Sequence, residues 1–307
     1  MVHPPAFLRH ALTAIVLIAL IVGIVVKVTA HDDATADAQT PPTERLAELP
    51  GGGRSILPEH RVVVHYGSPL DRKLGVLGFG TPDEAGIRLL GTADDYRAPD
   101  QKPVLPAMEL IAVLVTADPG DGTHRLRMDR AMIEGYLSAA RSVGAILILD
   151  IQPGRSDFLT EAKALETYLL EPDVSLAIDP EWRMGPDEIP GKVIGHVDAV
   201  EVNRVTAWLS KLVREHKLPN KLLVIHQFED GMIARRDRLT TKPGIDAVLN
   251  ADGFGTREMK VNTYNRVTRG RGKFATGFKL FYEEDTGLMT PRQVLRLRPV
   301  PDVVMYE

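Results

Sequence analysis

Residues 145–152 read Ala-Ile-Leu-Ile-Leu-Asp-Ile-Gln, an apolar run that ends on an acid and an amide. A continuous apolar run of this length is typical of a strand buried on both faces, as in a parallel sheet covered by helices. The same pattern recurs along the chain, and a helix-like segment follows most of the copies. The predicted strands span residues 61–66, 108–116, 145–151, 174–178, 221–227, 245–250, 277–282 and 303–306.

Eight strands joined by helical crossovers are the number that a closed (β/α)8 barrel requires. The predicted fold is therefore α/β, a single TIM-barrel domain of parallel strands over residues 60–307. The first predicted helix begins at Thr81, a residue type that caps helices, followed by Pro82. An open doubly wound sheet is the alternative, disfavoured because no Gly-x-Gly-x-x-Gly turn follows the first strand. The other predicted helices span residues 129–143, 156–170, 200–216, 229–238, 256–269 and 291–297.

The N-terminal region is predicted to lie outside this domain. Residues 11–26 are apolar and flanked by Arg9 and Lys27. With its neighbours this stretch approaches the length of about 20 residues that a membrane span needs. Residues 1–30 are thus predicted to be a signal anchor that holds the domain outside the cytoplasm at the cell membrane, or a signal peptide cleaved after Ala30 to give a secreted protein. Residues 31–59, rich in Ala, Asp, Thr, Pro and Gly, are predicted to be a flexible linker.

Composition excludes several classes of function. The net charge is −4, which gives no electrostatic reason to expect nucleic-acid binding. The chain has no cysteine, which excludes disulfides, thiolate metal sites and a cysteine nucleophile. It also lacks His-x-His and His-Glu-x-x-His, so a zinc hydrolase is poorly supported. We therefore expect no metal and no cofactor.

Polar and aromatic side chains gather where the predicted strands end. In a barrel of parallel strands these ends share one face, the mouth where ligands bind. Aromatic rings in such a mouth suit carbohydrate, because the C–H faces of sugars pack on rings. The predicted substrate-binding residues are His65, Tyr66, Asp150, Gln152, Asp179, Trp182, His226, Gln227, Asp252 and Tyr282.

Acids that follow two different strands are candidates for catalysis. Two carboxyl groups can flank a scissile glycosidic bond, one as general acid and one as nucleophile or base. Glu181 is the predicted general acid, since Trp182 beside it could raise its pKa by desolvation. Glu283 and Asp285, after the strand of residues 277–282, are the predicted nucleophile or base.

These residues also have structural explanations. Glu181 could form a loop salt bridge with Arg183, and Asp150 could pair with Arg155. Lys279 could form a Schiff base, although a salt bridge to a neighbouring acid is the favoured role.

The histidines and Asp252 have such explanations as well. His65 and His226 could be satisfied core residues, or neutral imidazoles that bind substrate or a metal. The structural explanation for Asp252 is that it simply caps the following helix.

The placement of these acids resembles that in the large clan of retaining glycoside hydrolases, and the likeness covers the whole domain at the level of topology. In that clan the acid/base follows strand four and the nucleophile follows strand seven. The clan has Asn-Glu at strand four, where this chain has Asp179-Pro180-Glu181. The chain also resembles actinobacterial envelope proteins with glycoside-hydrolase-like barrels, a likeness that implies no particular activity.

The resulting hypothesis is a membrane-tethered, extracytoplasmic, glycoside-hydrolase-like protein that cleaves or binds a glycan. Its partners would be a carbohydrate at the mouth and the membrane at residues 1–30. One alternative is a non-catalytic barrel that binds a glycan or a protein. Another is a metal-dependent phosphodiesterase built on His65, Asp150 and Glu181.

Overall fold

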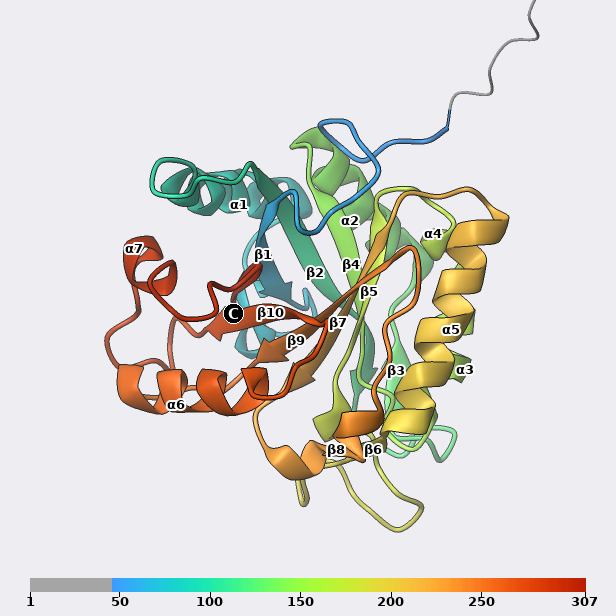
Figure 1. Cartoon of the computed structure of the whole chain (residues 1–307). Helices are drawn as coiled ribbons and strands as arrows, with labels where there is room; N and C mark the ends of the chain where they lie inside the picture. Colours follow the sequence, from blue (N-terminus) through green and yellow to red (C-terminus); the bar gives the residue numbers. More distant parts are fainter. Residues whose placement is uncertain (1–45) are drawn as a thin grey trace, which may run out of the picture. The chain divides into compact units, whose positions relative to one another are not determined.

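The computed structural model describes residues 46–307, which form a closed barrel of eight parallel strands surrounded by helices (Figure 1). Strand β1 pairs with β2 on one side and with β11 on the other, so the sheet closes on itself. The predicted TIM barrel is confirmed, and the open sheet is excluded. The barrel strands are β1 (Arg61–Gly67), β2 (Val104–Val115), β4 (Ile146–Ile151), β5 (Val174–Ile178), β7 (Lys221–Gln227), β9 (Ile245–Ala251), β10 (Ala275–Leu280) and β11 (Val303–Tyr306).

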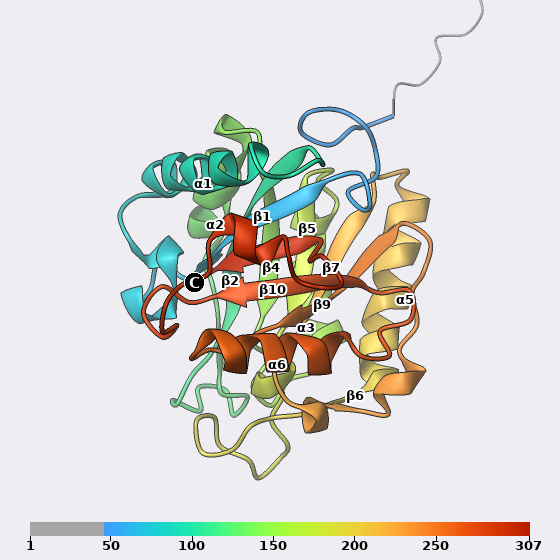
Figure 2. The ribbon, with the colours of Figure 1, turned by 60° about the vertical axis from the view of Figure 1, so that its left-hand side comes forward.

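The helices lie outside the strands, as the two views in Figures 1 and 2 agree. The helix predicted for residues 156–170 is split at Leu165, and the one predicted for residues 229–238 is wrong. The latter region contains two 3-10 turns around a short strand, and Arg235 between them has a left-handed backbone (φ 53°) that no helix continues through. The helices are α1 (Pro82–Arg97), α2 (Arg130–Ser142), α3 (Phe158–Ala164), α4 (Glu166–Leu169), α5 (Ala199–Glu215), α6 (Arg257–Thr268) and α7 (Pro291–Val294).

Three short strands and five 3-10 turns lie in the connections between the described barrel strands and helices. Strand β3 (Arg125–Arg127) pairs antiparallel with the end of β2, and β6 (Val197–Asp198) pairs with β8 (Ile233–Ala234). The 3-10 turns are η1 (Arg72–Leu74), η2 (Val76–Gly78), η3 (Pro180–Trp182), η4 (Asp230–Met232) and η5 (Arg236–Arg238).

Helix α1 begins where the sequence predicts. The Thr81 hydroxyl accepts a hydrogen bond from the Glu84 backbone N–H, and the Glu84 carboxylate accepts one from the Thr81 N–H. This capping box satisfies two backbone donors that a helix start otherwise leaves unpaired.

The end of the barrel at which the strands begin is closed by residues 49–57. Leu49, Ile56 and Leu57 are buried in the cluster that fills the barrel interior. The Arg54 guanidinium donates to the carbonyls of Lys217 and Leu218. The predicted linker therefore ends earlier than Glu59, because these apolar side chains have a place to be buried. The predicted anchor lies outside the described residues, and within residues 46–307 no helix is long and apolar enough to cross a membrane.

We expect Ile56→Ala to destabilise the domain by about 2–5 kcal/mol, because Ile56 is 0% exposed and its truncation leaves a cavity. Ile87→Ala is the matched control, since Ile87 is 68% exposed on α1 and its loss should cost no more than about 0.5 kcal/mol. Urea unfolding of both variants measures the difference. Equal stabilities would show that residues 49–57 are not part of the folded unit.

Candidate functional site

The site arises from a change in chemistry along the inward faces of the strands. Every second side chain of a strand points to the same side. On β1, Val62 and Val64 pack in the interior cluster, and on β4 Ile146 and Ile148 do the same. The next inward residue of each strand is polar. The polar layer above the apolar cluster comprises Tyr66, Glu109, Asp150, His226, Asn250, Lys279 and Glu307.

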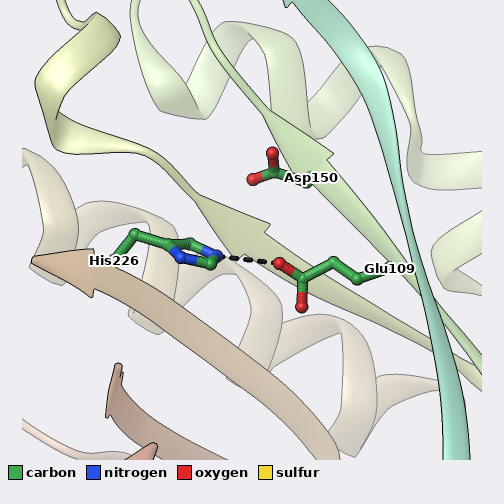
Figure 3. Close-up of side chains that lie close together, drawn as sticks. All are labelled: Glu109, Asp150 and His226. Atoms are coloured by element: carbon green, nitrogen blue, oxygen red, sulfur yellow. Dashed lines mark hydrogen bonds and ion pairs between the residues drawn. The ribbon is translucent and has the colours of Figure 1, made fainter. Parts of the chain in front are cut away.

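His226 lies at the centre of this layer. Its Nε2 atom is 2.8 Å from Oε1 of Glu109, and its Nδ1 atom is 2.6 Å from Oδ2 of Asp252. Asp179 Oδ1 is 3.7 Å from Nδ1. Burial lowers the pKa of His226, but these carboxylates outweigh it and hold the pKa well above its ordinary value. Figure 3 shows the imidazole pointing at Glu109, with the Asp150 carboxyl beside both.

Lys279 is paired with acids rather than free. Its Nζ atom is 2.6 Å from Glu307 Oε2 and 3.4 Å from Asp252 Oδ2, and it lies 3.5 Å from the centroid of the Tyr66 ring. Burial lowers the pKa of Lys279, but Glu307 and Asp252 outweigh it and keep the amine charged. The predicted salt bridge is confirmed, and a Schiff base is unsupported because it needs a neutral amine.

Asp150 and Asp179 share the hydroxyl of Tyr66, which lies 3.2 Å from Asp150 Oδ2 and 3.3 Å from Asp179 Oδ2. The Gln152 amide donates to Asp179 Oδ2 at 3.2 Å. Asp150 Oδ1 is buried and has no hydrogen-bond partner. Burial raises the pKa of Asp150 well above its usual range, and Asp179 adds to the effect. Arg155 does not brace Asp150, because its guanidinium donates to the carbonyl of Glu188.

Glu181 follows β5 in the turn η3 and lines a cavity of about 450 Å³ above the polar layer. The residue is partly exposed, but its Oε2 atom is buried without a hydrogen-bond partner. Burial raises the pKa of Glu181 well above its usual range, and Asp179 and Asp252 raise it further. The loop salt bridge is absent, because Arg183 pairs with Glu201 instead.

The walls and floor of this cavity differ in character. Its walls carry four aromatic rings, those of Trp182, Phe228, Phe254 and Phe281. Its floor is polar and includes the residues Tyr66, Gln152, Asp252, Lys279 and Glu307. The cavity therefore offers apolar faces around a charged base. Asp252 does not cap α6, since Thr256 does so.

Three predicted substrate-binding residues lie elsewhere. His65 alternates with Tyr66 along β1 and faces α1, where its Nε2 atom is 2.9 Å from the Thr92 hydroxyl. Gln227 alternates with His226 and accepts from Arg236 at 2.8 Å. Tyr282 stacks on Tyr306 outside the cavity, with ring centroids 5.4 Å apart. Because His65 faces away from the axis, His65, Asp150 and Glu181 do not converge as the phosphodiesterase hypothesis requires.

The two acids predicted after β10 also lie outside the cavity. Asp285 forms a buried ion pair with Lys260 at 2.9 Å and accepts from the backbone N–H groups of Gly255 and Phe281. Glu283 is exposed beside a neighbouring, smaller cavity lined by Arg72 and Lys73. The predicted site residues that line the cavity are Tyr66, Gln152, Glu181, Trp182 and Asp252. Three others are buried and do not line it, namely Asp150, Asp179 and His226.

Glu109, Asn250 and Glu307 belong to the polar layer and were not among the predicted site residues. Glu109 carries the clearest signal, since it is the only charged residue in the 12-residue strand β2. An unpaired charge in a strand buried on both faces is costly, so it indicates a partner or a ligand. The Asn250 amide donates to Asp252 Oδ1 at 2.6 Å and so helps to fix that carboxylate.

Fold and site together define a TIM-barrel protein with an acidic, aromatic-walled mouth. No family model and no curated protein matches the chain. Among solved structures it is similar to the wild-type sialic acid aldolase of Ruminococcus gnavus, with a TM-score of 0.40 and 8% sequence identity over 80% of this chain and 67% of that one.

Proposed function

We propose that this protein acts on a glycan and is a glycoside hydrolase in which Glu181 is the general acid. The observation that carries the proposal is the buried, unpartnered Glu181 Oε2 atom in a cavity with aromatic walls. A general acid must hold a proton near neutral pH and must be free to donate it. Burial raises the pKa of Glu181 and so favours the protonated form.

Asp252 supplies the second carboxylate in this proposal. It lines the same cavity from the end of β9, and Asn250 and Lys279 hold its two oxygens in place. Glu181 gives its proton to the glycosidic oxygen as the bond between that oxygen and the anomeric carbon breaks. Asp252 either bonds to the anomeric carbon or takes the proton of the attacking water. It thus takes the role that the sequence assigned to Glu283 or Asp285.

The walls and floor of the cavity suit a sugar. The rings of Trp182, Phe228 and Phe254 can pack on the C–H faces of a pyranose. Gln152 and Glu307 on the floor offer hydrogen-bonding groups to hydroxyls. The wider proposal is that residues 1–30 tether the barrel outside the cytoplasm, where its substrate is an envelope or environmental glycan. The acid–base step itself requires no cofactor.

Trp182→Ala should raise the Kd for a glycan roughly 10- to 100-fold, because about 1.5–3 kcal/mol of apolar burial is lost. Trp208→Phe is the matched control, since Trp208 packs against the outer core from α5 and does not line the cavity. It should bind like the wild type and leave Trp182 as the only tryptophan, whose fluorescence then reports binding. Equal affinities of Trp182→Ala and the wild type would remove the stacking role.

The proposal as a whole is tested on purified full-length chain with a panel of envelope glycans and aryl glycosides. Turnover that depends on Glu181 supports a hydrolase. Glycan binding without any turnover would instead favour the non-catalytic binding barrel. Neither binding nor turnover across the panel would reject the glycan as the partner.

A further inference from the structure

The buried polar layer holds more acids than cations. Its cationic groups are His226 and Lys279. They face three acids of the layer, Glu109, Asp150 and Glu307, and two acids beside it, Asp179 and Asp252. Buried charges persist in proteins only when they are paired or bind a metal. The excess of acid is therefore balanced by a further positive group, either a proton on a carboxyl group or a metal ion.

The shortage of positive groups lies on one side of the imidazole of His226. On the Nδ1 side, Asn250 and Lys279 donate to the oxygens of Asp252, and Gln152 donates to Asp179. Those carboxylates are satisfied by groups of the chain itself.

On the Nε2 side the situation differs. Glu109 and Asp150 are both 0% exposed, and Glu109 Oε2 and Asp150 Oδ1 have no hydrogen-bond partner. A buried acceptor without a donor costs about 1–3 kcal/mol. Two such oxygens beside one ring nitrogen indicate a missing cation.

We propose that Glu109, Asp150 and His226 bind a divalent transition-metal ion, Zn²⁺ or Mn²⁺, beneath the cavity. One ligand atom from each of the three residues lies within 4.8 Å of the others (Figure 3). Ligands of tetrahedral Zn²⁺ stand about 2.0–2.2 Å from the ion, which sets neighbouring ligand atoms about 3.3–3.6 Å apart. The 2.8 Å between Glu109 Oε1 and His226 Nε2 is the distance of a hydrogen bond, and it widens when an ion replaces the shared proton. Binding the ion displaces the proton from Nε2 of His226. Small shifts of the side chains then bring the three ligand atoms to the distances that the ion requires.

The groups around these residues are placed as supports for a metal ligand. A ligating histidine donates its other ring N–H to a carboxylate, which fixes its tautomer and orientation. His226 Nδ1 lies 2.6 Å from Asp252 Oδ2, in position for that bond. Tyr66 donates to Asp150 Oδ2 and leaves Oδ1 for the ion.

The ligand set selects the kind of metal. Two carboxylates and one imidazole suit Zn²⁺ or Mn²⁺. Ca²⁺ takes six to eight oxygen ligands, more than these three residues supply, and Mg²⁺ prefers oxygen ligands to an imidazole. The inference goes beyond the proposed function, since proton donation by Glu181 requires no metal.

The test begins with metal analysis of the full-length chain and of the protein after stripping with a chelator. Calorimetric titration of the stripped protein with Zn²⁺, Mn²⁺, Mg²⁺ and Ca²⁺ should give one site for Zn²⁺ or Mn²⁺, with a higher Tm when it is filled. Glu109→Gln and Asp150→Asn should each weaken binding at least about 100-fold, beyond the 10–100-fold that loss of a supporting group costs. Glu181→Gln is the matched control, since this carboxyl is not a ligand, and it should bind the metal like the wild type.

Co²⁺ provides a readout that needs no variant, because a bound imidazole and carboxylates give it visible absorption bands. Wild-type protein that takes up none of these ions, or variants that bind them as tightly as the wild type, would overturn the inference. Turnover of a glycoside by metal-free protein would overturn neither proposal if the metal still binds. Metal binding without turnover would reject the hydrolase alone.

Discussion

Glu181→Gln should lower glycoside turnover by roughly 10²–10⁴-fold, the contribution of a general acid. The amide keeps the shape of the side chain and cannot give a proton to the leaving oxygen. Thermal stability should change little, because Glu181 Oε2 has no hydrogen-bond partner to lose. Glu283→Gln makes the same chemical change at an exposed acid outside the cavity and should retain turnover. If Glu283→Gln lost turnover and Glu181→Gln kept it, the catalytic role would return to the acids after β10.

The pH dependence of kcat/KM is a second test of Glu181 as the general acid. In the proposed mechanism the acid form of Glu181 is the active one, so kcat/KM should fall as pH rises through its pKa. Because burial raises that pKa, the fall should come at a higher pH than for an ordinary glutamate. This alkaline limb should be missing from the residual activity of Glu181→Gln. A limb that persists in the variant would belong to another group.

Asp285→Ala should destabilise the domain by about 3–5 kcal/mol, the usual cost of removing one partner of a buried ion pair. Both side chains of the pair with Lys260 are 1% exposed. The Lys260 ammonium also lies 5.2 Å from the centroid of Phe278 and 5.0 Å from that of Phe281, so it cannot turn to water without disturbing the core. Urea unfolding measures the loss.

The pH dependence of this loss has a definite sign. Burial lowers the pKa of Lys260 below its ordinary value, and without Asp285 it should fall further. A buried lysine with a lowered pKa destabilises most where it is charged, so the gap between variant and wild type should shrink as pH rises through that pKa. Glu283→Ala, at an exposed site two residues away, should cost no more than about 0.5 kcal/mol. Equal losses in both variants would reject the structural role of Asp285.

The barrel could be predicted from the sequence because its strands are buried on both faces and read as continuous apolar runs. Asp150 and His226 were found because each stands at the end of such a run. Glu109 was missed because its strand begins at Val104, four residues before the predicted start. A residue near the start of a predicted strand is expected at the closed end of the barrel, far from the mouth. The register instead sets Glu109 level with Tyr66. Such stagger between strands is a property of barrel closure and leaves no local trace in the sequence.

The direction of side chains limited the rest of the prediction. His65 and Gln227 stand one residue from Tyr66 and His226, and that single step turns them from the axis towards the helices. After β10 the chain turns, so that Asp285 bonds back to the N–H of Phe281. The inward acids near Lys279 are instead Asp252 and Glu307, from the neighbouring strands β9 and β11.

Residues 49–57 close the end of the barrel where the strands begin, and the mouth is at the opposite end. An affinity handle that is attached through that closed end and bound to a sensor chip leaves the cavity unobstructed. The protein could then be immobilised in a fixed orientation, with every mouth open to the flowing solution. Long polymers could reach the aromatic walls without first passing the support.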